Sequence, residues 1–388
     1  MSVVYLDWAA TAIPDKEIIK KIAAAALDSY GNPSSGHTMG KNAAKYLSES
    51  RLLFSDALEC KPEQIVFTSG ATESNNMVFL SFLNKKKKGS IIVSALEHPS
   101  IFEPAKVLGN FGFDIRLIKP GKNGIIDPHK LSSLIDSTTQ LISIMHVNNE
   151  TGSIQNIGEI NRIIDAAEKK YHSNIHFHSD AVQGFGKIPF DVKNLDSASF
   201  SGHKIGAPMG TGALYLKKPL DFLSTGGMQE KGLRPGTENL YGLYGFGLAV
   251  KKYFVNMSRN HAEMCKIMGL LIDNVRSIGH NVIIPDVDNR FDSFSPYILS
   301  IAFPPIPGEV LVRILGDKGF AVSTGSACSS KTRDRKKRGR VITSLGFDME
   351  TAFSSIRISI GHSTSKDDVV RFSETLEKEV KKLIQIAK

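Results

Sequence analysis

Two short polar sequences near the middle of the chain combine residues that could share one reaction. HSDAVQ (178–183) supplies a carboxylate at Asp180, and SGHK (201–204) supplies an amine at Lys204. Each follows a strand-like segment, and catalytic groups commonly stand at strand ends. Pyridoxal 5'-phosphate (PLP) needs a lysine for its Schiff base and an aspartate to keep its ring nitrogen protonated. We therefore expect PLP to bind here, although either residue alone would indicate little more than a surface charge.

A third motif could hold the phosphate of that cofactor. TSGATESNN (68–76) joins a predicted strand to a predicted helix, and its small residues allow close backbone approach at the helix N-terminus. Free N–H groups and the helix dipole favour a phosphate at such a position. Without Lys204 nearby, the same motif would indicate only an ordinary helix cap. The predicted phosphate ligands are Ala71, Thr72, Ser201 and His203.

Three further polar residues follow predicted strands. His98, in LEHPS, could stack on the cofactor ring and move protons, or could be a hydrogen-bonded structural histidine. Asn149, in MHVNNETG, and Gln183 could reach the phenolic oxygen of the cofactor, or could be turn or surface amides. The residues alone leave these alternatives open.

The three cysteines, Cys60, Cys265 and Cys328, are too few and too scattered for a disulfide framework or a metal site. Cys328 lies in a sequence rich in Gly and Ser and precedes KTRDRKKRGR (331–340), which has seven basic residues and one acidic residue. Nearby positive charge favours the reactive thiolate form. Cys60 and Cys265 lack such surroundings and are expected to be inert.

The basic segment 331–340 also accounts for most of the net charge. It carries +6 of the formal +9, which leaves +3 for the rest of the chain, so a general nucleic-acid-binding surface is not indicated. The segment is either a solvated, mobile loop or a guide for an acidic partner or a tRNA.

The length and the hydropathy pattern indicate a globular protein of two domains. The chain has 388 residues, of which 41% are hydrophobic, and it has neither a membrane-length apolar run nor a signal-peptide pattern at its start. We expect a cytoplasmic location. Strand-like and helical segments alternate from residue 14 to about 255, which predicts an α/β fold with a mostly parallel sheet covered by helices. The predicted strands include 90–94, 140–147 and 212–216, and a helix is predicted at 157–171. The expected domains are residues 13–257 and a smaller α+β unit at 258–388, with residues 1–12 packed near the latter.

Together these motifs resemble the PLP-dependent cysteine desulfurases of the NifS/IscS class, and they cover nearly the whole chain in the expected order. The matching sequences are YLDWAATA (5–12), GNPSSGH (31–37), TSGATESNN, EHPS (97–100), MHVNNETG (145–152), HSDAVQ, SGHK, GLRPGTEN (232–239), STGSACSS (323–330) and SSIRISIG (354–361). The resemblance implies a fold-type I PLP enzyme that is a homodimer. It implies conversion of L-cysteine to L-alanine, with the sulfur left as a persulfide and passed to an iron-sulfur scaffold or a tRNA-thiolation relay.

The resemblance also assigns roles residue by residue. Lys204 matches the Schiff-base lysine, Asp180 the partner of the ring nitrogen, and His98 the ring-stacking histidine. Asn149 and Gln183 match contacts to the ring oxygen, and Asn149 also lies beside the substrate. Thr237 matches a threonine donated to the phosphate by the partner subunit, Arg357 the arginine that binds the substrate carboxylate, and Cys328 the nucleophile.

Three features depart from the family pattern: Trp8 replaces a smaller or polar residue, Met228 replaces a glycine, and the sequence after Cys328 is unusually basic. A selenocysteine lyase or another PLP-dependent aminotransferase on the same fold is the alternative enzyme. A protein without catalytic activity that docks acidic partners is the alternative from another class. The presence of all the expected catalytic residues argues against the latter.

Overall fold

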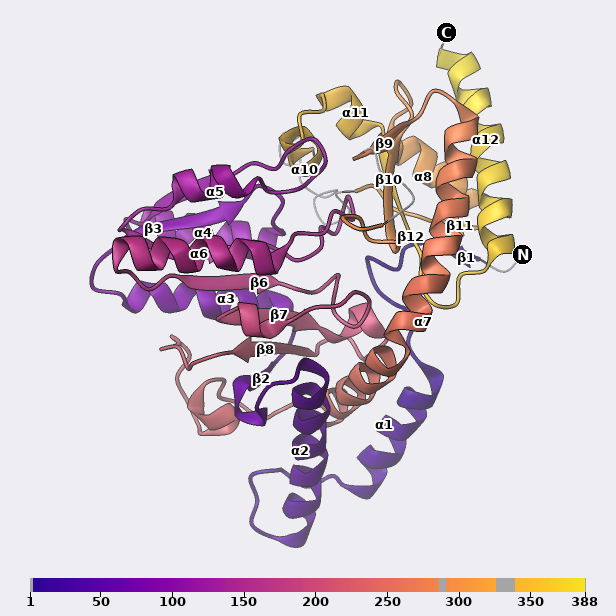
Figure 1. The fold of residues 1–388 in the computed structure, drawn as a ribbon. Helices are drawn as coiled ribbons and strands as arrows, with labels where there is room; N and C mark the ends of the chain where they lie inside the picture. The colour runs from indigo at the N-terminus through magenta and orange to yellow at the C-terminus, as the bar shows by residue number, and fades with distance from the viewer. Residues whose placement is uncertain (1–2, 286–290, 326–338, 388) are drawn as a thin grey trace.

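A seven-stranded sheet forms the centre of the larger part of the molecule (Figure 1). The computed structural model describes residues 3–285, 291–325 and 339–387. The strands lie in the order β2-β8-β7-β6-β5-β3-β4; β8 is antiparallel to β2 and to β7, and the other neighbours are parallel. Their bounds are β2 Ile65–Thr68, β3 Ser90–Ser94, β4 Asp114–Ile118, β5 Thr139–Ser143, β6 His176–Asp180, β7 Ser197–Ser201 and β8 Gly212–Leu216. The prediction of a mostly parallel sheet is confirmed.

Helices cover both faces of this sheet because its buried strands carry apolar side chains on both sides. Ile91, Val93 and Leu141 pack in one core with helices α3 and α4. Ile92 and Ile142 point to the opposite core, to which α2, α6 and α7 contribute. The helix bounds are α1 Lys16–Asp28, α2 Thr38–Leu58, α3 Ala71–Ser81, α4 Pro99–Asn110, α5 Pro128–Leu134, α6 Ile157–Tyr171 and α7 Leu240–Ile278.

The smaller part of the molecule has its own hydrophobic core beside an antiparallel sheet of order β12-β10-β9. Val4 and Leu6, from the start of the chain, belong to this core, and β1 pairs in parallel with β11. The N-terminal residues therefore lie beside residues more than 300 positions away. The remaining bounds are β1 Val4–Tyr5, β9 Val282–Ile284, β10 Ile298–Ala302, α8 Gly308–Asp317, β11 Phe320–Ala321, α10 Arg340–Ser344, α11 Met349–Phe353, β12 Ser355–Ser359 and α12 Lys366–Ala387.

Helix α7 runs from one part of the molecule into the other (Figure 1). Leu243 and Phe246 in its first half are buried in the core of the larger sheet, whereas Ile267 and Leu271 in its second half are buried in the smaller core. The proposed division at residue 257 falls between these two sets of side chains. α12 packs along the second half, and α1 and α2 pack against the helix in the larger part.

Strand β5 is shorter than the alternation over 140–147 predicts, and the reason bears on the site. The backbone N–H of Met145 donates to the carboxyl Oε1 of Glu97 at 2.6 Å, so a side chain replaces the neighbouring strand there. The chain is thereby free to turn toward Asn149. None of the described helices is both long enough and apolar enough to cross a bilayer.

Candidate active site

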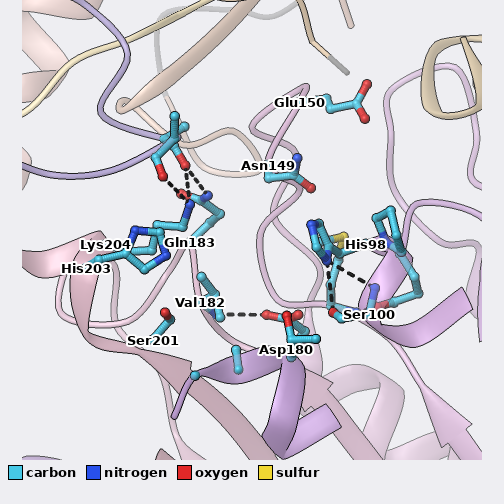
Figure 2. A pocket seen from close by; sticks show the side chains of 18 of the residues that line it. His98, Ser100, Asn149, Glu150, Asp180, Val182, Gln183, Ser201, His203 and Lys204 are labelled. Carbon is cyan, nitrogen blue, oxygen red and sulfur yellow. Dashed lines mark hydrogen bonds between the residues drawn. The ribbon is translucent and has the colours of Figure 1, made fainter. Parts of the chain in front are cut away.

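A cavity of about 910 Å³ opens at the carboxyl ends of β3, β5, β6 and β7. Figure 2 shows Lys204, His203 and Gln183 on one side of it, His98 and Ser100 opposite, and Asp180 between them. Ten residues predicted from the sequence line this cavity: Ala71, Thr72, His98, Asn149, Asp180, Gln183, Ser201, His203, Lys204 and Arg357. The strand ends thus collect side chains that lie up to 286 positions apart in the chain.

Lys204 lies on the short helix η4 (Gly202–Ile205), directly after β7. Its Nζ donates hydrogen bonds to the carbonyl oxygens of Ala9 and Ala10, each at 2.7 Å. These acceptors belong to the N-terminal sequence YLDWAATA. The N-terminal segment therefore orients the amine, a contact that reasoning from the sequence did not predict.

Trp8, which departs from the family pattern, has a structural role in the N-terminal segment. The ring is buried and packs edge-on against His362, with 5.1 Å between ring centroids. A Cβ atom on Gly361 would lie 2.2 Å from the indole, so only glycine allows this approach. The next residue, Ala9, donates from its backbone to Ser359 Oγ at 2.8 Å. Trp8 thus helps to fix the segment that orients Lys204.

Asp180 is buried at the end of β6 and is linked to His98 by two side chains. Asp180 Oδ2 accepts from Asn75 Nδ2 at 2.9 Å, and the same amide nitrogen donates to Ser100 Oγ at 2.9 Å. His98 Nδ1 accepts from the backbone N–H of Ser100 at 3.2 Å and lies 2.9 Å from Ser100 Oγ. Because Nδ1 accepts, a neutral His98 carries its proton on Nε2.

Asn75 and Ser100 were not predicted as site residues, although both stand inside motifs that were singled out, TSGATESNN and EHPS. Their signal in the sequence is proximity to Thr72 and His98. Asn75 is fully buried, and its Oδ1 lies 3.0 Å from His178 Nε2. All three polar positions of its side chain are therefore used within the protein.

The N-terminus of α3 forms one end of the cavity. Gly70 is its N-cap, and no side chain in the described part of the chain caps the first-turn N–H groups there. Such groups suit a phosphate. Ser201 and His203 line the same cavity. The pKa of His203 is lowered to about 4 by burial, with Lys204 and Lys187 acting in the same direction, so His203 is neutral at pH 7.

Gln183 provides a test of whether the pocket suits PLP. Its Nε2 donates to Ala9 O at 2.9 Å, but its buried Oε1 has no hydrogen-bond partner among the described residues. A buried amide oxygen without a partner in a cavity wall indicates a ligand position. Together with the amine of Lys204, the carboxylate of Asp180 and the uncapped helix, the residues present fit PLP.

Arg357 lies on β12 and is only 3% exposed. Its Nη2 donates to Asp7 Oδ1 at 2.8 Å and to Ser323 Oγ at 2.9 Å, and its Nη1 donates to the backbone oxygen of Asn149 at 3.0 Å. The buried Nε has no partner among the described residues. This guanidinium is therefore fixed on one side and able to donate on the other. The role of Asp7 was not predicted.

Two carboxyl groups in the cavity wall were also missed, although each adjoins a predicted residue. Glu97 precedes His98, and burial, assisted by the nearby Asp180, raises its pKa well above the usual range. Glu150 follows Asn149, and burial raises its pKa to about 7 against the opposing effects of Arg340 and Arg357. Figure 2 shows Glu150 pointing away from His98, beyond Asn149.

The structure corrects one expectation about the basic segment. Arg340, its last residue, lies in the cavity wall and is not part of a solvated loop. The residues 331–338 of that segment, and Cys328, lie outside the described part of the chain. Thr237 is exposed and does not line the cavity of its own chain.

The other two cysteines have surroundings that oppose reactivity. Both are partly buried. Burial, together with Glu63, raises the pKa of Cys60 to about 11, and burial raises the pKa of Cys265. At neutral pH both thiols therefore stay protonated. Within the described residues, no cluster of His, Cys, Asp and Glu could hold a metal ion.

Comparisons with known proteins agree with this site. Residues 4–372 match the family model described as "Aminotransferase class-V". The chain belongs to this family. It is similar to "Cysteine desulfurase IscS" of Dictyoglomus turgidum, with 36% identity across 99% of this chain and 96% of the relative. Members of the family use PLP, and the relatives place this chain among the cysteine desulfurases.

Solved structures of related proteins superpose on this chain over nearly its whole length. A "NIFS-LIKE PROTEIN" superposes with a TM-score of 0.89 at 32% identity, covering 98% of this chain and 99% of its own. A structure titled "SspA in complex with cysteine" superposes with a TM-score of 0.78 at 29% identity, covering 93% of this chain and 99% of its own. The expected fold-type I architecture is therefore confirmed.

Proposed function

We propose that this desulfurase uses L-cysteine as its substrate and Cys328 as its sulfur carrier. The overall reaction is L-cysteine plus the Cys328 thiol giving L-alanine plus a Cys328 persulfide, in which every atom is conserved. One observation carries this proposal: a single cavity brings together an amine, a buried carboxylate, an uncapped helix N-terminus and a partly free guanidinium.

The residues that would hold PLP follow from that cavity. Lys204 would supply the amine, Asp180 would pair with the ring nitrogen, and His98 would lie against the ring. Gln183 would contact the ring oxygen, and the N-terminus of α3, with Ser201 and His203, would hold the phosphate. When bound, PLP would act as an electron sink for charge that develops on the substrate carbon atoms.

Once PLP is bound, a small set of side chains would remain to act on the substrate. The free donors of Arg357 suit the substrate carboxylate, and Asn149 lies beside them. Lys204 Nζ would remove and return a proton at carbon. His98 Nε2, the ring nitrogen that Ser100 does not hold, would move a second proton. The Cys328 thiolate would attack the substrate sulfur as the nucleophile: the S–S bond forms as the carbon–sulfur bond breaks, and the electron pair of the broken bond stays with the carbon fragment, which takes up a proton to give alanine.

The direct test is product analysis with purified protein, PLP and L-cysteine. We expect L-alanine and, with a thiol reductant, an equal amount of sulfide. Lys204→Ala should lose both products and the visible absorbance of the bound cofactor. Full turnover by Lys204→Ala would contradict the proposal. Amino transfer to a keto acid without sulfur release would favour an aminotransferase, and turnover of selenocysteine alone would favour a selenocysteine lyase.

The assembly and the acceptor are part of the same proposal. Thr237 is exposed and does not line its own cavity, which suits donation to the phosphate site of a second subunit in a homodimer. An iron-sulfur scaffold or a thiolation relay in the cytoplasm is the acceptor that the resemblance to the NifS/IscS class implies. The basic segment 331–340 would then favour an acceptor with an acidic surface.

A further inference from the structure

Arg340 lies at the end of the basic segment and at the start of α10. Its side chain is half-buried beside the cavity. Nη2 donates to the backbone oxygen of Glu97 at 2.5 Å, and Nη1 donates to the backbone oxygen of Ala95. The guanidinium carbon also lies 3.8 Å from the centre of the Phe102 ring. The planar guanidinium is therefore held by three partners, namely two backbone oxygens and one aromatic ring.

All three partners flank His98 in the chain. Ala95 and Glu97 belong to the turn between β3 and His98, and Phe102 lies on α4, which begins directly after His98. Within the described residues, the two carbonyl oxygens accept no other hydrogen bond. Buried backbone oxygens require a donor, so Arg340 completes the hydrogen bonding of this turn.

We propose that Arg340 is a positioning residue for His98, holding the turn before it and the helix after it in one arrangement. The inference deepens the proposed function and relies on His98 facing the cofactor. Arginine suits the task because its forked N–H groups reach two carbonyls while its plane stacks on an aromatic ring. A lysine offers a point charge and can do only part of this.

The charge of Arg340 has a second consequence for His98. Burial lowers the pKa of His98; among the charges, Asp180 raises it, while Lys204 and Arg340 lower it. The other charged or titratable groups that face this region are Glu97, Glu103 and Lys106 near the turn and α4, Glu150 after β5, His203 on η4 and Arg357 on β12. Arg340 therefore helps to keep the imidazole neutral, with its proton on Nε2.

Two substitutions separate the effect of the paired hydrogen bonds of Arg340 from the effect of its charge. Arg340→Lys keeps the charge but loses the paired contacts, whereas Arg340→Gln loses the charge. Phe102→Leu removes the stacking and keeps the charge, and it serves if Arg340→Gln does not fold. Lys20→Gln is the matched control, because it removes an exposed cation on α1 that pairs with Glu17 at 2.9 Å and does not line the cavity.

The main readout is the titration of His98 by NMR in full-length, histidine-labelled protein, without and with PLP. His98→Asn assigns its signal among the 11 histidines. We expect a higher titration midpoint in Arg340→Gln and unchanged midpoints in Arg340→Lys, Phe102→Leu and Lys20→Gln. The second readout is cysteine turnover, for which kcat should fall in Phe102→Leu and roughly tenfold or more in Arg340→Lys, with little change in KM, because a displaced catalytic group slows chemistry more than binding. Lys20→Gln should keep the wild-type kcat.

The possible results distinguish failure of this proposal from failure of the proposed function. An unchanged His98 midpoint in Arg340→Gln, or wild-type kcat in Arg340→Lys, would overturn the proposal. Failure of the proposed function is a separate result, namely no cysteine turnover in the wild-type protein, and the His98 titration still decides the role of Arg340 in that case. Far-UV circular dichroism of each variant confirms that the comparison is made between folded proteins.

Discussion

Replacing Arg357 by lysine should weaken cysteine binding although the positive charge is kept. A guanidinium has five N–H donors, and three of those of Arg357 are used by Asp7, Ser323 and the backbone of Asn149. Two donors, one of them the buried Nε–H, remain for a ligand. An ammonium has only three donors. If it satisfies the same three protein acceptors, nothing is left for the substrate carboxylate.

The size of the effect follows from the bonds lost. A hydrogen bond to a charged group contributes about 1.5 to 3 kcal/mol. Loss of one such bond corresponds to roughly 10- to 150-fold weaker binding, and loss of both would reach or exceed the upper end of that range. The comparison should be made on KM and on the dissociation constant of L-alanine, which keeps the carboxylate but has no sulfur to transfer.

Cysteamine, which is cysteine without its carboxylate, provides the control. The wild-type protein should strongly prefer cysteine, and Arg357→Lys should lose most of that preference while its activity toward cysteamine changes little. Equal losses for both compounds would show that Arg357 supports the structure through Asp7 and does not bind substrate. Asp7→Asn, which keeps one acceptor for Nη2, should have a smaller effect than Arg357→Lys.

Three further predictions rest on other parts of the site. Cys328→Ser should retain the cofactor spectrum but form no persulfide, and mass spectrometry of the wild-type protein should find the added sulfur on Cys328 and not on Cys60, whose pKa is about 11. Mixing inactive Lys204→Ala with a weakened Thr237→Val should restore activity if each site takes Thr237 from the other subunit, whereas additive losses would refute the shared site. The pKa of His178 is lowered to about 3 by burial, so the unfolded chain binds the proton first as the pH falls below 6.5. Chemical denaturation should therefore show the wild-type protein losing about 2 kcal/mol more than His178→Gln between pH 6.5 and 4.5; parallel curves would contradict this.

The local pattern of apolar residues predicted the helices and strands in which that pattern is strong. The segments expected at 157–171, 90–94 and 212–216 agree with α6, β3 and β8, because each has apolar residues at the spacing of its own structure. Alternation could not locate the end of β5, since the apolar pattern continues past Ser143. The strand ends there because the carboxyl group of Glu97 takes the place of a neighbouring strand. The domain boundary at 257 stays a prediction.

The sequence predicted the site residues whose chemical type the reaction requires. It did not predict the residues that only hold another side chain or turn in place. An amine, a carboxylate and an anion-binding turn could be recognised at Lys204, Asp180 and the start of α3. Asn75 looks like any helix amide until the fold brings it between Asp180 and Ser100. Arg340 belongs by composition to a hydrophilic segment, and only the position of α10 beside the turn before His98 brings it into the cavity wall.

The N-terminal segment shows most clearly why local reasoning was incomplete. The carbonyls of Ala9 and Ala10 accept from Lys204, and Asp7 accepts from Arg357, so three residues within a four-residue stretch orient two groups of the cavity wall. β1 holds the start of this segment beside β11, and Trp8 packs against Gly361 just after β12. The amine belongs to the larger sheet and the guanidinium to the smaller one. The segment therefore couples the two sheets to one site, and any shift between the sheets would change the distance between the cofactor amine and the substrate carboxylate.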